Sequence, residues 1–251
     1  MPTRVYILDS GSLQITEAQM LWNRGSPKRL RVPCYSVLID HASGLYLFDT
    51  GFDLAAVQRN LPSTRPRQSP NQSLVQQLRL LDISPDDIGH VINSHYHFDH
   101  CGGNARFGSA TFVCHEREYA AALHPHEFEK SSYMNSTFLE LLDRTRLTTV
   151  SGDVVLSDGI WLIETTGHTA GHYSLMVELA GRRPMLFTAD AAWTEQNLTL
   201  DCIPSFHFDP LAATRSIARL RKLAAEYDAE LFFPHDPVAF EQYHKAPMFY
   251  T

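Results

Sequence analysis

Three histidines and one aspartate fall within six residues of this chain, and this cluster limits the fold more than any other feature of the sequence. Residues 94–103 read Ser-His-Tyr-His-Phe-Asp-His-Cys-Gly-Gly, which brings together His95, His97, Asp99 and His100. A single histidine of this kind is usually an ordinary polar residue. Imidazoles and carboxylates packed this closely are poorly satisfied unless a cation organises them, so the cluster predicts a metal site.

The spacing within the cluster is suited to two neighbouring ions. Residues 90–94 resemble a strand, and successive side chains of a strand point to opposite faces, so His95 and His97 are expected on the same side. Asp99 and His100 follow as the chain turns into the glycine-containing bend at residues 101–104. Glycine lets the backbone turn sharply, which would bring this second pair beside the first.

Composition narrows the class of protein. A chain of 251 residues with 44% hydrophobic residues can bury a large core, and we expect one domain over residues 1–251. The sequence has no 18-residue apolar stretch and no apolar leader at its N-terminus. We therefore expect a cytoplasmic protein without a membrane partner. The formal net charge is −7, and residues 28–31, the longest basic cluster, are interpreted as a solvated loop. A nucleic acid is therefore not an expected partner.

The four cysteines do not form a recognisable metal or disulfide motif. Cys34, Cys101, Cys114 and Cys202 are scattered without a Cys-x-x-Cys pair, so we expect free thiols. Cys101 directly follows His100, but the bend at residues 101–104 already explains a small residue there. We do not interpret Cys101 as a ligand.

The order of predicted elements indicates an α/β fold. Apolar runs predict strands at residues 4–8, 34–39, 44–48, 90–94, 110–114, 160–164, 173–179, 185–189 and 230–233. Helical spacing of apolar residues predicts helices at 73–81, 116–123, 133–144 and 211–227. Two strand-rich halves, each followed by helices, favour two sheets packed face to face with helices outside, in a four-layer αβ/βα sandwich.

Three further polar residues follow predicted strands in the second half. They are His168, Asp190 and His235. Strand ends are where sheet scaffolds place chemistry, so these residues are expected to join the first cluster. Five imidazoles and two carboxylates suffice for two ions if one carboxylate is shared, and Asp190 is the natural bridge.

The motifs resemble those of the metallo-β-lactamase-fold superfamily over essentially the whole chain. Residues 95–100 match its H-x-H-x-D-H signature, Asp-Thr-Gly stands at 49–51, and Thr-Gly-His-Thr-Ala-Gly-His at 166–172 is similar to its later motif. The resemblance implies that Asp49 supports the ligand histidines and that His172 has a structural, hydrogen-bonding role. It assigns one ion to His95, His97 and His168, a second to Asp99, His100 and His235, and both to Asp190. The implied cofactors are two Zn²⁺ ions, although Fe, Mn or Co suits the same donors.

Within the superfamily, the chain resembles the lactonase branch. Residues 118–124, 208–210 and 233–236 are similar to N-acyl homoserine lactone lactonases, whereas 22–25, 98–104 and 206–210 look at least as much like 4-pyridoxolactonase. The implied activity is a dinuclear-metal-dependent hydrolase that opens a lactone, foremost an N-acyl homoserine lactone in quorum quenching. A metal-bridging hydroxide would attack the carbonyl, and Asp99 would be the catalytic proton carrier.

One departure from that branch concerns the substrate pocket. Quorum-quenching lactonases usually carry Tyr three residues after the bridging aspartate, and this chain has Trp193. An indole can donate a hydrogen bond but has no acidic hydroxyl, so we interpret Trp193 as a pocket wall rather than a donor to the lactone. The other predicted substrate-binding residues are Met20, Trp22, Phe206 and His207.

Three other functions use the same residues. A 4-pyridoxolactonase would open a flat pyridine lactone, and a thioesterase of the glyoxalase II kind would use Lys28, Arg29 and Arg31 for its anionic substrate. A non-catalytic zinc-stabilised binding protein would need every metal position filled by side chains, whereas seven ligands for two ions leave a bridging position open. We therefore expect an enzyme whose partner is a small lactone, with a homodimer as the plausible assembly.

Overall fold

The computed structural model describes residues 2–134, 139, 142 and 144–251. The first half of the chain supplies six strands and several short helices. In chain order they are β1 (Arg4–Thr16), α1 (Glu17–Met20), β2 (Arg29–His41), β3 (Gly44–Phe48), α2 (Leu54–Asn60), α3 (Leu74–Arg79), β4 (His90–Ile92), α4 (Phe98–Cys101), β5 (Thr111–His115), α5 (Glu116–Leu123) and β6 (Leu147–Val150).

The second half supplies five strands and the longest helix of the described chain. Its elements are β7 (Val154–Ser157), β8 (Ile160–Glu164), β9 (Tyr173–Val177), β10 (Met185–Phe187), the 3-10 turn η6 (Ala189–Ala191), α7 (Glu195–Thr199), α8 (Pro210–Glu226), β11 (Glu230–Phe232) and α9 (Pro237–Gln242). Asp209 caps α8, because its carboxylate accepts from the first free backbone N–H groups, and Pro210 fits the first helical position.

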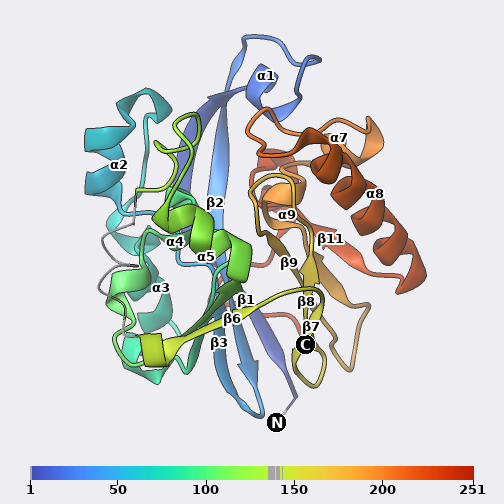
Figure 1. The fold of residues 1–251 in the computed structure, drawn as a ribbon. Helices are drawn as coiled ribbons and strands as arrows, with labels where there is room; N and C mark the ends of the chain where they lie inside the picture. The colour runs from blue at the N-terminus through green and yellow to red at the C-terminus, as the bar shows by residue number, and fades with distance from the viewer. Residues whose placement is uncertain (1, 135–138, 140–141, 143) are drawn as a thin grey trace.

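Two sheets face each other, with helices on their outer sides (Figure 1). The first has the strand order β1-β2-β3-β4-β5-β6, and the second has the order β11-β10-β9-β8-β7. Leu74 and Leu78 of α3 pack on the outer face of the first sheet, and Ile217 and Leu220 of α8 pack on that of the second. The predicted four-layer αβ/βα sandwich is confirmed.

Strand direction decides where the functional residues meet. β1, β2 and β3 form an antiparallel meander, β4 pairs in parallel with β3, and β5 pairs in parallel with β4. In the second sheet β8 and β10 are each antiparallel to β9, and β11 is parallel to β10. The carboxyl ends of β8, β10 and β11 therefore lie at one edge of their sheet, as those of β3 and β4 do in theirs.

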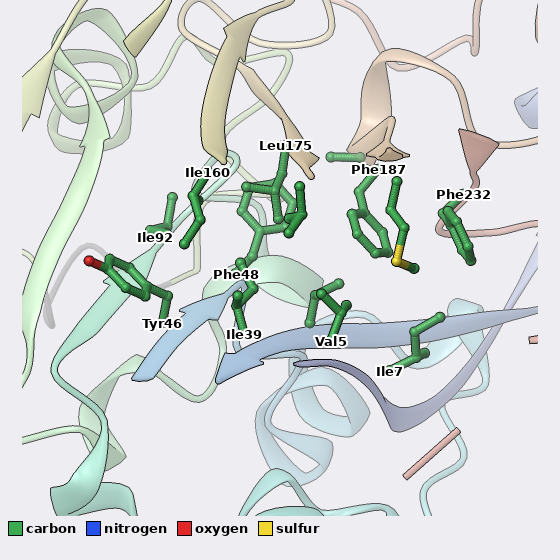
Figure 2. Packing of buried hydrophobic residues seen from close by; sticks show 14 of the residues in the cluster. Val5, Ile7, Ile39, Tyr46, Phe48, Ile92, Ile160, Leu175, Phe187 and Phe232 are labelled. Atoms are coloured by element: carbon green, nitrogen blue, oxygen red, sulfur yellow. The ribbon is translucent and has the colours of Figure 1, made fainter. Parts of the chain in front are cut away.

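The main core lies between the sheets (Figure 2). Val5 and Ile7 of β1 point into it, toward side chains of the second sheet such as Phe187, whereas Tyr6 and Leu8 join the cluster beneath α3. This alternation is the two-residue period of a strand, and both faces of β1 are buried because each sheet is covered on both sides.

Several predicted boundaries differ from the structure. The first two strands are longer than predicted, and β2 begins at Arg29, so residues 28–31 are not simply a solvated loop. Arg31 donates hydrogen bonds from this strand to Ser12 Oγ and to the carbonyl of Arg65. The predicted helix at 133–144 falls largely outside the described residues. The unpredicted elements, including β6 and β7, are too short to show a clear period.

Two predictions about composition can be compared with the described residues. The four cysteines all lie among the described residues and form no disulfide there, as expected, and all four are buried. Within the described ranges, no helix combines the length and apolar character needed to cross a membrane.

Candidate metal centre

The first four predicted ligands lie just beyond the carboxyl end of β4. The strand ends at Ile92, so His95 and His97 lie in the following loop, and strand alternation is not what orients them. Asp99 and His100 lie on the one-turn helix α4, for which His97 is the N-terminal cap residue. The glycine bend at residues 101–104 follows them, as the sequence indicates, but the short helix α4 that carries both residues was not predicted.

The other three predicted ligands follow strands of the second sheet. His168 lies between β8 and β9 in a turn where Gly167 has φ of 125°, a conformation that favours glycine. A Cβ on Gly167 would also collide with the backbone of Ala213 at the start of α8. Asp190 lies in η6 directly after β10, and His235 lies between β11 and α9. All three reach one site because their strands run in the same direction.

The first group of donors consists of three buried imidazoles. One ring nitrogen from each of His95, His97 and His168 lies within 4.8 Å of the others. His168 Nδ1 donates to the carbonyl of Phe206 (2.7 Å), which leaves its Nε2 with a lone pair, 3.0 Å from His97 Nδ1. Burial lowers the pKa of all three imidazoles, so they are held in the neutral form that binds metal.

The second group surrounds the Asp190 carboxylate. Asp190 Oδ1 lies 3.0 Å from His100 Nε2 and 3.4 Å from His235 Nε2, whereas Oδ2 lies 3.3 Å from His168 Nε2. The two oxygens thus face different imidazoles, as a bridging ligand requires. Asp99 Oδ2 completes the group, 3.6 Å from His235 Nε2 and 3.9 Å from His100 Nε2.

Orphaned atoms test whether this arrangement fits a metal. His95 Nε2, His97 Nε2, His100 Nε2 and Asp190 Oδ1 are buried without a hydrogen-bond partner. His100 Nε2 and Asp190 Oδ1 are 3.0 Å apart, yet their geometry is not that of a hydrogen bond. Buried polar groups are normally paired, and several lone pairs left free around one volume are what a cation satisfies. The donor set therefore fits metal ions.

The carboxylates and imidazoles of the second group shift each other's pKa values. Burial raises the pKa of Asp190, but the His100 and His235 imidazoles outweigh burial and hold that pKa well below its usual range. Burial likewise disfavours charged His100, but the surrounding carboxylates, Asp190 first, raise its pKa well above its usual value. Asp190 therefore stays ionised and supplies negative charge beside the donor nitrogens.

Asp49 connects two of the ligand histidines. Its carboxylate accepts from the Ser94 N–H (2.8 Å), from Ser94 Oγ (2.7 Å) and from His100 Nδ1 (2.7 Å). Ser94 Oγ in turn lies 2.9 Å from His95 Nδ1 and, having donated to Asp49, accepts from it. Because Nδ1 of each ring is engaged in this way, Nε2 is the ring nitrogen that each histidine directs to the donor groups.

His172 lies behind the site rather than among the donors. Its Nε2 accepts from the backbone N–H of Asp190 (3.0 Å), and its Nδ1 lies 2.9 Å from Thr165 Oγ1. Burial holds the pKa of His172 well below its usual value, so the ring is neutral, with Nδ1 as the donor. This is the structural, hydrogen-bonding arrangement that the resemblance implied, and it orients the turn that carries Asp190.

Glu118 of α5 is a residue of the site that the sequence analysis missed. It is fully buried, and its carboxylate accepts from the backbone N–H of Tyr96 (2.9 Å), from the hydroxyl of Tyr133 (3.1 Å) and from the backbone N–H of Gly171 (3.2 Å). Tyr96 separates His95 from His97, and Gly171 belongs to the loop of His168. One carboxylate therefore holds two ligand-bearing loops together.

A cavity of about 460 Å³ opens above the donor atoms. Five of the predicted ligands line it, namely His97, Asp99, His168, Asp190 and His235, and so do Trp193, Phe206 and residues of β1 and β2. The structure thus brings two of the five predicted substrate-binding residues to the cavity. The other three, Met20, Trp22 and His207, are not among the described residues that line the cavity. Met20 is buried beside it, and Trp22 contacts His207 edge-on at the surface.

Trp193 both lines the cavity and binds the shared carboxylate. Its Nε1–H donates to Asp190 Oδ2 (2.7 Å), so the indole N–H is already used and does not face a substrate carbonyl. The ring also lies edge-on to the His235 ring, 5.3 Å away between centroids. The indole thus has a role beside that of the predicted pocket wall, and nothing in the sequence indicates it.

Replacing Trp193 with phenylalanine should therefore weaken metal binding while leaving the fold intact. Loss of a hydrogen bond to a metal-ligating carboxylate costs about 10- to 100-fold in affinity, and phenylalanine keeps most of the ring contacts. Competition with a chromophoric chelator measures the change, with Trp161→Phe as the matched control on the outer side of the second sheet. Equal metal affinities for Trp193→Phe and the wild-type protein would show that the indole does not orient Asp190.

Comparison with known proteins places this geometry in a family. Residues 29–235 match the metallo-beta-lactamase superfamily. The chain is 32% identical to the N-acyl homoserine lactonase AttM of Rhizobium radiobacter, over 99% of this chain and 98% of that protein. It is 30% identical to the N-acyl homoserine lactonase AiiA of Bacillus thuringiensis subsp. kurstaki, over 93% of both.

A solved structure supports the same relationship. An N-acyl homoserine lactone hydrolase with the product N-hexanoyl-L-homoserine bound at its catalytic metal center superimposes with a TM-score of 0.88 at 29% identity, over 100% of both chains. The match in sequence, in fold and in the grouping of donors leads to one conclusion. This chain belongs to the metallo-β-lactamase superfamily.

Proposed function

We propose that this protein is a metal-dependent hydrolase that opens the ring of N-acyl homoserine lactones, and so quenches quorum signals. The observation that carries the proposal is the set of orphaned imidazole and carboxylate atoms, of which those of His97 and Asp190 belong to residues that line an open cavity. Relatives aligned over nearly the whole chain are N-acyl homoserine lactonases, which names the substrate class.

Two ions are proposed, held by the donor sets described above, with Asp190 shared. Imidazole and carboxylate donors suit Zn²⁺, which we propose as the native metal, and Fe, Mn and Co are the alternatives that the same ligands accept. Ions bound there supply Lewis acidity and make hydroxide available near neutral pH.

The chain's own residues orient the substrate and move the proton. Asp99 lines the cavity beside His235 and is placed to carry a proton from the attacking water to the ring oxygen that leaves. Leu13, Ile15 and Val32 also line the cavity, and their apolar side chains suit the acyl chain. Because Asp190 occupies the indole N–H of Trp193, that group does not polarise the lactone carbonyl here.

The test is a pH-stat assay of the zinc-loaded protein on an N-acyl homoserine lactone and on 4-pyridoxolactone, side by side. We expect the acyl lactone to be opened, and Asp99→Asn to lower kcat by about 10²- to 10⁴-fold, the usual contribution of a proton-transferring group. Asp86→Asn, an exposed carboxylate remote from the cavity, is the matched control.

Each other outcome selects one of the alternatives. Opening of the pyridine lactone alone would indicate a 4-pyridoxolactonase. Turnover of thioesters alone would indicate a glyoxalase II-like enzyme. Inactivity on all three, with both metals bound, would favour a non-catalytic zinc-stabilised protein. The single domain, the homodimer and the cytoplasmic location stay predictions, of which light scattering can test the dimer.

A further inference from the structure

A buried cysteine stands beside the second group of donors, and the proposed reaction does not use it. Cys34 lies in β2 and is 2% exposed. Its Sγ, a carboxylate oxygen of Asp99 and a ring nitrogen of His235 all lie within 4.8 Å of one another. The three imidazole nitrogens of the first group also lie within 4.8 Å of one another. The sulfur is therefore positioned like a further ligand and not like an isolated core residue.

Strand β2 explains why the sulfur is placed there. The carbonyl of Pro33 accepts a hydrogen bond from His235 Nδ1 (2.8 Å), so His235 Nε2 is the ring nitrogen that faces Asp99 and Asp190. The next residue along the strand is Cys34. The same short segment thus orients the imidazole through its backbone and brings a sulfur atom next to it.

Independent evidence for a ligand comes from the atoms around His235. His235 Nε2 lies 3.4 Å from Asp190 Oδ1, which is buried and has no hydrogen-bond partner. His100 Nε2, on the other side of that oxygen, is also buried and unpartnered. Two orphaned atoms thus lie beside the Cys34, Asp99 and His235 group, so the need for a cation is not inferred from the cysteine.

We propose that Cys34 is a sulfur ligand of the second metal position, together with Asp99, His100, His235 and the shared Asp190. The inference rests on the two-metal site proposed above and does not depend on which lactone is the substrate. When the metal binds, a metal–sulfur bond forms, the S–H bond breaks and the proton passes to solvent, so no oxidant or reductant is needed.

A sulfur ligand would make the two metal positions chemically different. The first position offers three imidazoles and one oxygen of Asp190, whereas the second would add a soft thiolate to imidazole and carboxylate donors. Thiolates favour Zn²⁺, Cd²⁺ and Co²⁺ over the harder Mn²⁺. We therefore expect the second position to be the more selective of the two.

The thiol of Cys101, another cysteine close to the ligands, donates to backbone carbonyls. Cys101 directly follows His100, but its Sγ lies 3.2 Å from the carbonyl oxygens of both Tyr96 and His97 and donates to them. Cys202 donates to the carbonyl of Trp22 and is not part of a donor group within the described residues. Cys202→Ser is therefore a suitable control for Cys34→Ser.

Cobalt absorption spectroscopy tests the proposal, because sulfur ligation gives a charge-transfer band in the near ultraviolet that is distinct from the visible d–d bands of Co²⁺. The metal-free protein is titrated with Co²⁺ to two equivalents. We expect the charge-transfer band in the wild-type protein and in Cys202→Ser, and its loss in Cys34→Ser, which keeps its d–d bands. The second equivalent of Cd²⁺ should bind Cys34→Ser about 10- to 100-fold more weakly, with Mn²⁺ affinity unchanged.

The Co²⁺ spectrum of the wild-type protein tests whether Cys34 is a ligand even if Cys34→Ser does not fold. Visible d–d bands and two bound equivalents without a charge-transfer band would overturn the assignment of Cys34 and leave the imidazole and carboxylate site standing. Failure to bind Co²⁺ at all would overturn the metal centre itself, and with it both proposals.

Discussion

Replacing Asp190 with asparagine should abolish lactone opening and release metal. Asparagine keeps the size of the side chain but removes the charge from the centre of the site, where Oδ1 faces His100 and His235 and Oδ2 faces His168. Loss of the shared ligand removes several kcal/mol of transition-state stabilisation, so kcat/KM should fall by on the order of 10³-fold or more.

Metal content measured by atomic emission separates this effect from a change in chemistry. We expect Asp190→Asn to retain at most one ion per chain. The control is Asp201→Asn, whose carboxylate is exposed and pairs with Arg221 at the surface. Two retained ions together with near wild-type turnover would show that Asp190 does not bridge the donor groups.

Replacing Glu118 with alanine should destabilise the protein and weaken metal binding together. The change leaves the N–H groups of Tyr96 and Gly171 and the hydroxyl of Tyr133 without their acceptor in a buried position. Each unsatisfied buried group costs about 1–3 kcal/mol, so the free energy of unfolding should fall by at least about 3 kcal/mol. Metal affinity should fall about 10- to 100-fold because both ligand loops lose a common anchor.

Urea unfolding and chelator competition measure the two effects. Glu116→Gln is the matched control, because Glu116 lies two residues earlier on the same helix and is exposed. A Glu118→Ala protein that unfolds like Glu116→Gln and keeps wild-type metal affinity would contradict the role assigned to this carboxylate.

The stability contributed by Glu118 should also depend on pH. Burial raises its pKa from 4.5 to about 7, so between these values the folded protein binds more protons at this residue than the unfolded chain does. Its contribution is therefore fully present below pH 4.5 and is lost as the pH rises to about 7. The difference in unfolding free energy between the wild-type protein and Glu118→Gln should show this slope, and a difference independent of pH would contradict it.

Much of the fold and the grouping of the donors could be predicted from the sequence. His95, His97, Asp99 and His100 are neighbours along the chain, so their proximity follows from connectivity alone. The distant residues His168, Asp190 and His235 join them because each follows a strand, and β8, β10 and β11 run in the same direction. The rule that strand ends carry chemistry was therefore sufficient to select these residues before their contacts were known.

The residues that hold the ligands could not be found in this way. Glu116 and Glu118 look alike in the sequence of α5, yet one is exposed and the other fully buried, which depends on the loops that pack against the helix. Cys34 resembles any small apolar residue in a strand until His235, 201 positions further along the chain, is placed beside it. α4 was missed because its four residues are too few to show a helical period.

Stepwise metal loading of the metal-free protein, with lactone opening followed at each step, tests the central claim most directly. Because Asp190 joins the two donor groups, we expect ring opening of an N-acyl homoserine lactone to rise mainly with the second equivalent of Zn²⁺ and to vanish when a chelator removes it. Full turnover without metal, or two bound ions without turnover of any lactone, would contradict the account.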